Sequence, residues 1–519
     1  MNDATAREVP GAPARQPPAD GGASPARPGT RLFLAGAVAF AAVIAGYLVY
    51  KFTRPSGYTV FPEDLNVYRI GGLIVRHVRP WYNPHLAHPL YDWPGYGPLH
   101  LQFTYTPFAA VVFAPLSVIP WVWLVRLSEL ANVGFLLLTL WFTFGALNYR
   151  SWRVRAGATL LTAAVVFPTE PVLRNIDLGQ INLALMALIV WDMTQPDRRW
   201  WKGAGVGIAA GIKLVPLIFI PYLLVTRRFR QAAVASATFA GTILLGFIVL
   251  PADSAKWWFT GMFFNGGSRA GFIAWEGNQS LRGITARLMG SVAGSDHVWL
   301  VLAVLTIAAG MACAAVLDRK GHRMAGLLAT ALTGLLASPI SWDHHWVWIA
   351  PGVALAGHYA VRATAARTGG AAVGQAPAQT RAARWRGWVT RARLATSGGQ
   401  AWAYWAVAAG LVLVFLSWPG ALFGKPQDNG NFSFGLIYLP PGTGMATYER
   451  FGDRPRFAEY HWHGLNLLLG NAWVLSGIAL LALLALLAWR SPGPRARAPE
   501  VQGAGAGLAA GGSPAAVSR

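Results

Sequence analysis

Long apolar runs separated by short polar and basic segments dominate the pattern of this chain. The first run, residues 32–51, is about 20 residues long, which is the length that a helix needs to cross a bilayer. Runs of roughly 15–25 apolar residues recur and predict further membrane helices. They lie near residues 129–147, 157–172, 181–194, 231–250, 298–317, 324–338, 346–361, 402–422 and 465–489. The pattern therefore predicts an all-α polytopic membrane protein.

The apolar run at 203–225 differs from the others because Lys213 and Pro216 lie near its middle. A straight passage through the membrane would place the basic cluster at 227–230 outside and reverse every later helix, against the positive-inside rule. Two half-helices that form a hairpin open to the cytoplasm avoid this, since non-helical backbone is tolerated at depth where it lines a cavity. Counting the hairpin as two short segments predicts about 12 segments, with both termini cytoplasmic.

Composition and charge agree with this predicted membrane topology. The chain has 519 residues, of which 54% are hydrophobic and only 12% charged, more apolar surface than a soluble domain buries. Its formal charge of +22 would suit nucleic acid, but most cations lie in short clusters between apolar runs, so we expect no nucleic-acid partner. Some arginines fall in long outer loops, where the rule carries little weight, among them Arg69, Arg76, Arg79, Arg450, Arg454 and Arg456. The clusters predicted to lie inside are at 150–155, 198–202, 227–230 and 319–323.

The same pattern divides the chain into membrane-embedded parts, a linker and two tails. The ends are rich in Pro, Ala, Gly and Arg, without periodicity, and are expected to be disordered cytoplasmic tails with no signal peptide. The expected parts are a tail at 1–31, a membrane module at 32–361, a basic cytoplasmic linker at 362–400, C-terminal membrane helices at 401–490 and a tail at 491–519. Long outer loops are predicted at 52–128, 251–297 and 423–464.

A carboxylate in the first outer loop is the leading catalytic candidate. In FPEDLNVYRIGG a proline and acidic residues predict the start of a helix. Asp64 and Tyr68 would then share one face, and the glycine pair at 71–72 would leave room for a ligand. A simpler alternative is that Asp64 only caps the helix, and Glu63 competes with it for any catalytic role.

Lys213 is the costliest charge in the chain. A lysine at mid-membrane costs roughly 2.5–3.5 kcal/mol on insertion scales, so it is expected to have a partner. The functional interpretation is contact with the phosphate of a lipid carrier. The alternative is that its side chain reaches the cytoplasmic surface.

SPISWDHHWVW places His344 and His345 at the outer start of a helix. Adjacent histidines point in different directions and no further ligand follows at a spacing of four, so no metal is expected. The lone Cys313 excludes a thiolate cluster. Contact with a phosphate or sugar fits better, with a structural role for this indole-rich segment as the alternative.

Two more polar segments are predicted on the outer side. RNIDLGQINL offers Arg174, Asn175, Asp177, Gln180 and Asn182, and EGNQSLRG offers Asn278, Gln279, Ser280 and Arg282. Together with the histidines they give this face the amides and charges that suit a sugar and a phosphate. The chain has no phosphate-binding or dinucleotide motif in a credible context, so no soluble cofactor is expected.

Six segments in order resemble a known family. EDLNVYRIGG, TYTPFAAVVFAPLSVIP, DLGQINLALMALIVWD, AAGIKLVPLIFIPYLL, GNQSLRGITARL and ASPISWDHHWVW are similar to actinobacterial polyprenyl-phosphate-mannose-dependent α-1,2-mannosyltransferases, glycosyltransferase family 87. The resemblance covers roughly residues 32–361 and implies a GT-C membrane fold with a sugar donor carried on polyprenyl phosphate. It implies that Asp64 is the base and that His344 and His345 lie near the donor phosphate.

The implied reaction is an inverting, metal-independent displacement on the outer membrane face, with a glycolipid or lipoglycan hydroxyl as acceptor. Lys213, His344, His345 and Arg282 would stabilise the phosphate, and Asn278 and Gln279 would help to bind the donor. Two other functions remain open at this point. The broken helix at Lys213 also suits a transporter or flippase of lipid-linked saccharides, and a non-catalytic subunit for envelope assembly is a further alternative.

Overall fold

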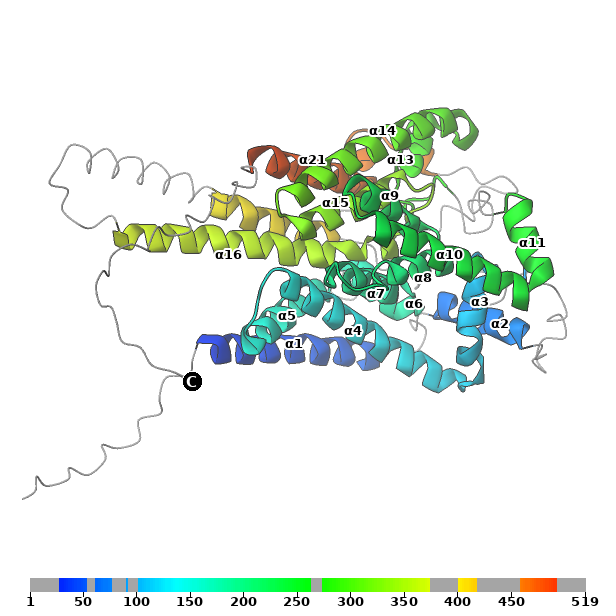
Figure 1. The fold of residues 1–519 in the computed structure, drawn as a ribbon, viewed down its shortest axis with the longest axis horizontal. Helices are drawn as coiled ribbons and strands as arrows, with labels where there is room; N and C mark the ends of the chain where they lie inside the picture. The colour runs from blue at the N-terminus through cyan, green and yellow to red at the C-terminus, as the bar shows by residue number, and fades with distance from the viewer. Residues whose placement is uncertain are drawn as a thin grey trace, which may run out of the picture.

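The computed structural model describes residues 28–53, 61–76, 90–91, 101–262, 273–373, 400–417 and 458–491. Within these ranges the chain is mostly helical, and its only β pairing consists of isolated bridges. The longest helices, such as α1 (Pro28–Thr53) and α16 (Ile349–Val373), run roughly along the long axis of the molecule (Figure 1). The prediction of an all-α polytopic membrane protein is confirmed.

Five described helices are long and apolar enough to cross a membrane. A sixth span is added if the bent pair α6 (Glu170–Leu178) and α7 (Asn182–Thr194), which meet at 115°, is counted as one. The five are α1, α4 (Trp121–Ala146), α10 (Phe229–Val249), α14 (Val292–Arg319) and α21 (Ala472–Arg490). Shorter elements include α5 (Trp152–Val166), α15 (Arg323–Ala337) and the helix Gln400–Phe415. The count of about 12 segments remains a prediction.

Several helix limits differ from the expected ones. The run predicted at 157–172 is divided into α5 and α6, because prolines at 168 and 171 interrupt it. The helix α4 begins at Trp121, inside the predicted outer loop 52–128, and α16 continues to Val373, into the predicted linker. Most of that linker, of both tails and of the loop 423–464 lies outside the described residues.

The start of α1 and the end of α21 lie at the same end of the molecule (Figure 1). Three of the predicted inner basic clusters meet one another through acidic partners. Asp197 pairs with Lys202 at 2.9 Å and with Arg323 at 3.2 Å, and Asp318 pairs with Arg228 at 2.8 Å. These three clusters therefore gather on one side, in agreement with the predicted topology.

The broken run around Lys213 forms a hairpin. The helix α8 (Ala204–Ile212) ends at Lys213, and the chain returns through the short 3-10 helix η4 (Val215–Ile218) and α9 (Phe219–Val225). Asp197 pairs with Lys202 before the hairpin and lies 4.0 Å from Arg228 after it. Both ends of the hairpin therefore lie on the same side of the bundle.

Two features hold the first half of the hairpin in place. The Asp192 carboxylate accepts hydrogen bonds from the backbone N–H groups of Gly203 and Val206, at the start of α8. Glycines at 203, 207 and 211 then face α10, and a Cβ on Gly207 would lie 2.5 Å from the Ala235 carbonyl oxygen. This small-residue stripe lets the two backbones approach closely, as in other membrane helix pairs.

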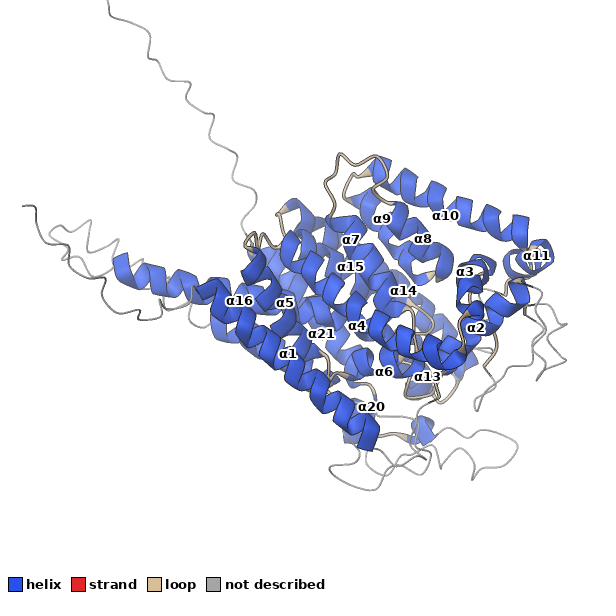
Figure 2. Ribbon diagram, turned by 90° about the horizontal axis from the view of Figure 1, so that it is seen from below, coloured by secondary structure: helices blue, strands red, loops and turns tan. Residues whose placement is uncertain are grey.

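One end of the bundle carries the helix that was predicted to start near Asp64. Helices α2 (Glu63–Val75), α3 (Pro107–Phe113) and α11 (Pro251–Phe259) gather at the end opposite the start of α1 (Figures 1 and 2). A Cβ on Gly71 would lie 2.5 Å from the Phe103 ring, and one on Gly72 would lie 2.5 Å from the Phe113 carbonyl oxygen. The expectation that these glycines leave room for a ligand was wrong, because α3 and its flanking chain occupy that space.

The C-terminal helices are joined to the rest of the bundle by buried polar contacts. The Arg287 guanidinium of α13 (Leu281–Met289) donates to Asn471 Oδ1 over 2.9 and 2.6 Å, between α20 (Gly464–Gly470) and α21. Ser417, just after the helix Gln400–Phe415, donates to Glu170 Oε2 over 3.1 Å. The helices beyond residue 400 therefore pack as part of the same body.

We predict that Gly207→Val destabilises the protein, because the added side chain must push α8 away from α10. Overpacking of this kind costs typically about 1–3 kcal/mol. Gly241→Val in α10 is the matched control, since a Cβ there meets no atom within 4 Å. Thermal unfolding of both variants in detergent checks this, and equal melting temperatures would contradict it.

Candidate functional site

Asp64 lies in the first turn of α2, but no side chain caps that helix through a hydrogen bond. The Gln180 side chain lies beside the Asp64 carboxylate and favours the ionised form. Burial raises the pKa of Asp64 above the ordinary value for an aspartate, although His344, Lys213 and Arg174 act in the opposite direction. Asp64 is thus a stronger base than an exposed aspartate, and it faces three cationic or imidazole side chains.

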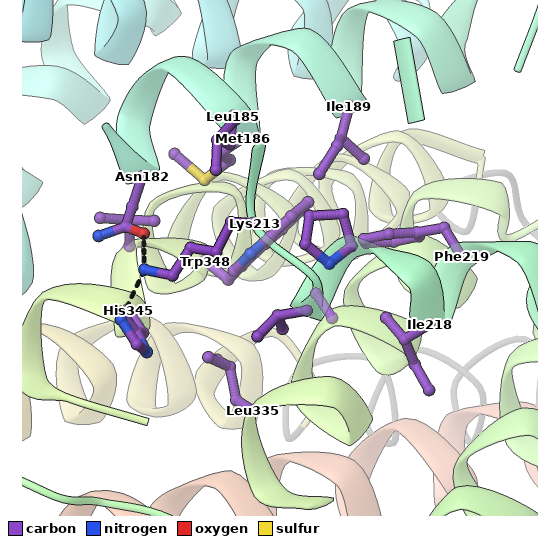
Figure 3. A pocket seen from close by; sticks show the side chains of 14 residues that line it. Asn182, Leu185, Met186, Ile189, Lys213, Ile218, Phe219, Leu335, His345 and Trp348 are labelled. Carbon is purple, nitrogen blue, oxygen red and sulfur yellow. Dashed lines mark hydrogen bonds between the residues drawn. The ribbon is translucent and has the colours of Figure 1, made fainter. Parts of the chain in front are cut away.

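Lys213 lies where the hairpin turns, and its ammonium has uncharged partners. Its Nζ donates to Asn182 Oδ1 over 2.8 Å and lies 2.7 Å from His345 Nε2 (Figure 3). Burial, with the nearby Lys213 charge, holds the pKa of His345 well below its ordinary value. His345 is therefore neutral and accepts from the ammonium. Two of the three Lys213 N–H groups are used in this way, which leaves one for a ligand.

The 3-10 helix η5 (Asp343–Trp348) carries both histidines. Asp343 Oδ1 lies 2.9 Å from His344 Nδ1, and Asp343 Oδ2 accepts from Arg174 Nε over 3.0 Å. Although burial opposes it, Arg174 and His344 hold the pKa of Asp343 well below its ordinary value. Because an ionised carboxylate only accepts, His344 Nδ1 carries the proton and Nε2 remains for a ligand.

The turn between α6 and α7 brings the remaining predicted residues together. Gly179 ends α6 in the left-handed conformation, with φ +66°, which few other residues adopt. Gln180 follows and accepts from Tyr68 over 2.9 Å, and the Asn182 side chain donates to Gln180 over 3.2 Å. Tyr68, Gln180 and Asn182 are thus linked, although α2 and this turn are more than 100 residues apart.

A cavity of about 50 Å³ begins at Lys213, Asn182 and His345 (Figure 3). Its other walls are apolar side chains of α7, η4, α9, α15 and η5. They are Leu185, Met186, Ile189, Val215, Pro216, Ile218, Phe219, Ala331, Leu335, Val347 and Trp348. The cavity therefore has one polar, cationic end and an apolar remainder.

Asn278 and Gln279 have local partners. Asn278 donates to the Ile273 and Pro339 carbonyls and accepts from the Ser341 N–H over 2.9 Å. Gln279 donates to the carbonyls of Glu276 and Gly470 over 2.7 and 2.8 Å. These amides support the chain just before η5, and neither lines the cavity. Their direct contact with a donor remains a prediction.

The other predicted residues lie elsewhere. Arg282 makes a two-point ion pair with Asp296, at 2.8 and 3.0 Å, and does not line the cavity. Asp177 accepts from Tyr47 over 3.5 Å, and Glu63 is buried next to Asp64. Among the described residues, no three His, Cys, Asp or Glu side chains lie close enough together to hold a metal ion.

Tyr105 and Asp343 belong to the site but were not predicted as functional residues. The Tyr105 hydroxyl lies 2.9 Å from that of Tyr68, and its ring lies 5.8 Å from Lys213 Nζ. Asp343 is 169 residues from its partner Arg174. The signal in the sequence is weak in both cases, because Tyr105 lies in an apolar, aromatic-containing segment and Asp343 is one of several polar residues beside the histidines.

We predict that Arg174→Met destabilises the protein strongly, because it leaves the Asp343 carboxylate buried without its cation. Breaking a buried ion pair at one partner costs about 3–5 kcal/mol. The double variant Arg174→Met/Asp343→Asn removes that charge and should recover part of the loss. Thermal unfolding of the single and double variants measures the coupling, and losses that simply add would argue against it.

The sequence matches the profile of glycosyltransferase family 87 over residues 103–339. It is 36% identical, over 59% of this chain and 68% of the relative, to a Mycobacterium tuberculosis (strain CDC 1551 / Oshkosh) polyprenol-phosphate-mannose-dependent alpha-(1-2)-phosphatidylinositol pentamannoside mannosyltransferase. It is 32% identical, over 61% of this chain and 74% of the relative, to the strain H37Rv enzyme named for phosphatidylinositol mannoside. No solved structure matches significantly. The chain is a multi-pass membrane protein that belongs to glycosyltransferase family 87.

Proposed function

We propose that the protein transfers a mannosyl unit from polyprenyl phosphate mannose to a hydroxyl of a glycolipid, on the outer membrane face, with inversion at the anomeric carbon. Both relatives are named for this donor and for phosphatidylinositol mannoside acceptors. The proposed acceptor is therefore a mannosylated glycolipid of that class, presented at the membrane surface.

The observation that carries this proposal is that a carboxylate base, Asp64, lies near two nitrogen-bearing side chains, those of Lys213 and His344. Asp64 is a carboxylate of raised pKa, and Lys213 and His344 both act on it electrostatically. A glycosyl phosphate needs this combination, a base for the incoming hydroxyl and positive charge for the departing phosphate.

In the proposed step, Asp64 takes the proton of the acceptor hydroxyl while that oxygen bonds to the anomeric carbon. The bond between that carbon and the phosphate oxygen breaks from the opposite face, and its electron pair leaves with polyprenyl phosphate. Phosphate is already a good leaving group, so it needs charge stabilisation more than a proton donor. The remaining N–H of Lys213 would supply that stabilisation, and His344 would add to it with a proton on Nε2 as well as on Nδ1.

The shape of the cavity supports a lipid-linked donor. Its cationic end suits the phosphate, and its apolar walls suit the first part of an isoprenoid chain. The hairpin that carries Lys213 also has both ends on the side of the basic clusters. With those clusters in the cytoplasm, Asp64 and the tip of the hairpin face the outer half of the membrane.

We predict that Asp64→Asn abolishes transfer while leaving expression and donor binding intact, because asparagine keeps the shape but cannot take a proton. Loss of a general base costs about 10²–10⁴-fold in rate. The assay uses membranes that contain the protein, radiolabelled polyprenyl phosphate mannose and a phosphatidylinositol mannoside acceptor.

Glu63→Gln is the matched control for this test, since Glu63 is the adjacent carboxylate. Transfer by Glu63→Gln with loss in Asp64→Asn supports the assignment, and the reverse result rejects it. Label that crosses sealed vesicles without being transferred would instead indicate a transporter.

We also predict an acid limb in the pH dependence of kcat/KM. The reaction needs the Asp64 carboxylate, whose pKa is raised by burial, so activity falls as the pH decreases through that raised value. The limb should therefore lie above the ordinary aspartate value of 3.8. Rates in buffered vesicles between pH 4 and pH 8 measure it, and rates that stay constant down to pH 4 would rule out an Asp64 base of raised pKa.

A further inference from the structure

We propose that Tyr105 is a positioning residue, which holds the Lys213 ammonium at a fixed separation from the helix that carries Asp64. The inference rests on the proposed function, in which Lys213 meets the donor phosphate and Asp64 takes the acceptor proton. Tyr105 acts on neither substrate directly. It acts through Lys213 at its ring and through Tyr68 at its hydroxyl.

The ring of Tyr105 adds a third uncharged neighbour to the ammonium. Its centroid lies 5.8 Å from Lys213 Nζ, and cation–π contacts extend to about 6 Å. Asn182 Oδ1 and His345 Nε2 accept hydrogen bonds from the same ammonium over 2.8 and 2.7 Å. An aromatic face attracts a cation without taking one of its protons or cancelling its charge. Tyr105 therefore restrains the Lys213 side chain while the third N–H stays available for an anion.

The hydroxyl of Tyr105 is attached to α2. The Tyr68 hydroxyl donates to Gln180 Oε1 over 2.9 Å, which uses its only proton. The Tyr105 hydroxyl lies 2.9 Å from that of Tyr68 and therefore donates to the Tyr68 oxygen. Tyr68 follows Asp64 by one turn of α2. One side chain thus connects the helix of the base with the cation of the hairpin.

Aromatic packing fixes the orientation of the Tyr105 ring. The ring stands edge-to-face against Tyr68, with centroids 5.1 Å apart, and against Phe113, with centroids 6.2 Å apart. Phe103 lies at 5.9 Å, and the Tyr91 hydroxyl donates to the Tyr105 carbonyl over 2.8 Å. Edge-to-face pairs favour one relative orientation of two rings. The buried ring is therefore held in a single position between α2 and the hairpin.

The next residue attaches the same segment to the hairpin itself. The Thr106 side chain caps α3 by accepting from the Ala109 N–H over 3.2 Å, and its hydroxyl donates to the Gly211 carbonyl. Gly211 lies in the last turn of α8, where the carbonyls lack partners within the helix, and it is two residues before Lys213. Backbone and ring contacts from residues 105–106 thus meet the hairpin at the same point.

The proposed displacement gives this connection a chemical role. The incoming hydroxyl and the departing phosphate lie on opposite sides of the anomeric carbon, so the base and the cation must be held a fixed distance apart. A misplacement of about 1 Å can cost about 100-fold in rate. Asp64 and Lys213 belong to different helices, and Tyr105 connects the two through contacts at both of its ends.

The test separates the two ends of the Tyr105 side chain. Tyr105→Phe keeps the ring beside Lys213 but loses the bond to Tyr68, so kcat should fall about 10–100-fold while donor binding is unchanged. Tyr105→Leu also loses the ring, and binding should weaken by about 10–30-fold. The measurements are kcat for mannosyl transfer and equilibrium binding of radiolabelled polyprenyl phosphate, with the full-length protein in lipid nanodiscs. A purely structural tyrosine would lower the melting temperature without this split between kcat and binding.

Two double-mutant cycles decide whether Tyr105 acts through its neighbours. In a Lys213→Met background, Tyr105→Leu should not weaken polyprenyl phosphate binding further, because the cation that it restrains is absent. In a Tyr68→Phe background, Tyr105→Phe should not lower kcat further. Losses of the same size in the wild-type and variant backgrounds overturn the proposal.

Tyr222 of α9 provides the matched control. It is also a buried tyrosine, its hydroxyl donates to Asp318 over 3.3 Å, and its ring lies 6.0 Å from the Arg228 guanidinium among the basic clusters. Tyr222→Phe and Tyr222→Leu should leave kcat and polyprenyl phosphate binding at the wild-type values. A wild type that binds polyprenyl phosphate without transferring mannose would reject the proposed function, and the binding cycle would still decide whether Tyr105 acts through Lys213. A wild type that does not bind polyprenyl phosphate would overturn both proposals.

Discussion

The burial of one ammonium group, that of Lys213, is the constraint on which the site depends. A charge at this depth is costly unless polar groups surround it, and the chain supplies an amide oxygen and a neutral imidazole rather than a carboxylate. A carboxylate in direct contact would have cancelled the charge. Uncharged partners stabilise the ammonium while leaving its positive potential directed into the cavity, where an anionic group would lie.

A second buried cation, Arg174, is paired with acids instead of neutral groups. Arg174 is in direct contact with an ionised acid, Asp343, and Glu170 lies 3.6 Å away on the same helix. This arrangement neutralises the guanidinium and fixes η5 against α6. The two cations are close in space but are held differently, one by acids that make it part of the framework and one by neutral groups that keep it reactive.

Much of the fold was predictable because an apolar bilayer requires long apolar helices, which are visible in the sequence. The apolar runs predicted α7 and α15 within about two residues, and the charge of the cluster at 227–230 predicted the hairpin before any contact was known. Helix limits were less predictable where a span continues into polar surroundings, as α16 does. No rule of length or hydropathy marks the end of a helix that leaves the membrane and continues in water.

The site was predictable as a set of residues but not as a set of contacts. Asp64, Lys213 and the histidines each carry a local signal, a charge or imidazole in an unusual setting. Tyr105 carries none, because an aromatic residue in an interfacial segment is common. Asn278 and Gln279 carry amides, which are typical of sugar-binding sites, but these amides bind backbone carbonyl groups instead. Only the three-dimensional arrangement separates amides that hold a loop from amides that face a ligand.

The contact between Arg287 and Asn471 gives the last helices a cooperative role. A chain that ended at residue 361, near the end of the family resemblance, would keep the guanidinium buried in α13 but remove the oxygen to which it donates twice. Gln279 would lose Gly470 at the same time. Arg287 would keep only its backbone carbonyl acceptors, so the two parts stabilise each other, and the membrane module and the C-terminal helices are expected to melt in a single transition. The histidine segment thus takes part of its rigidity from sequence that lies more than 100 residues beyond it.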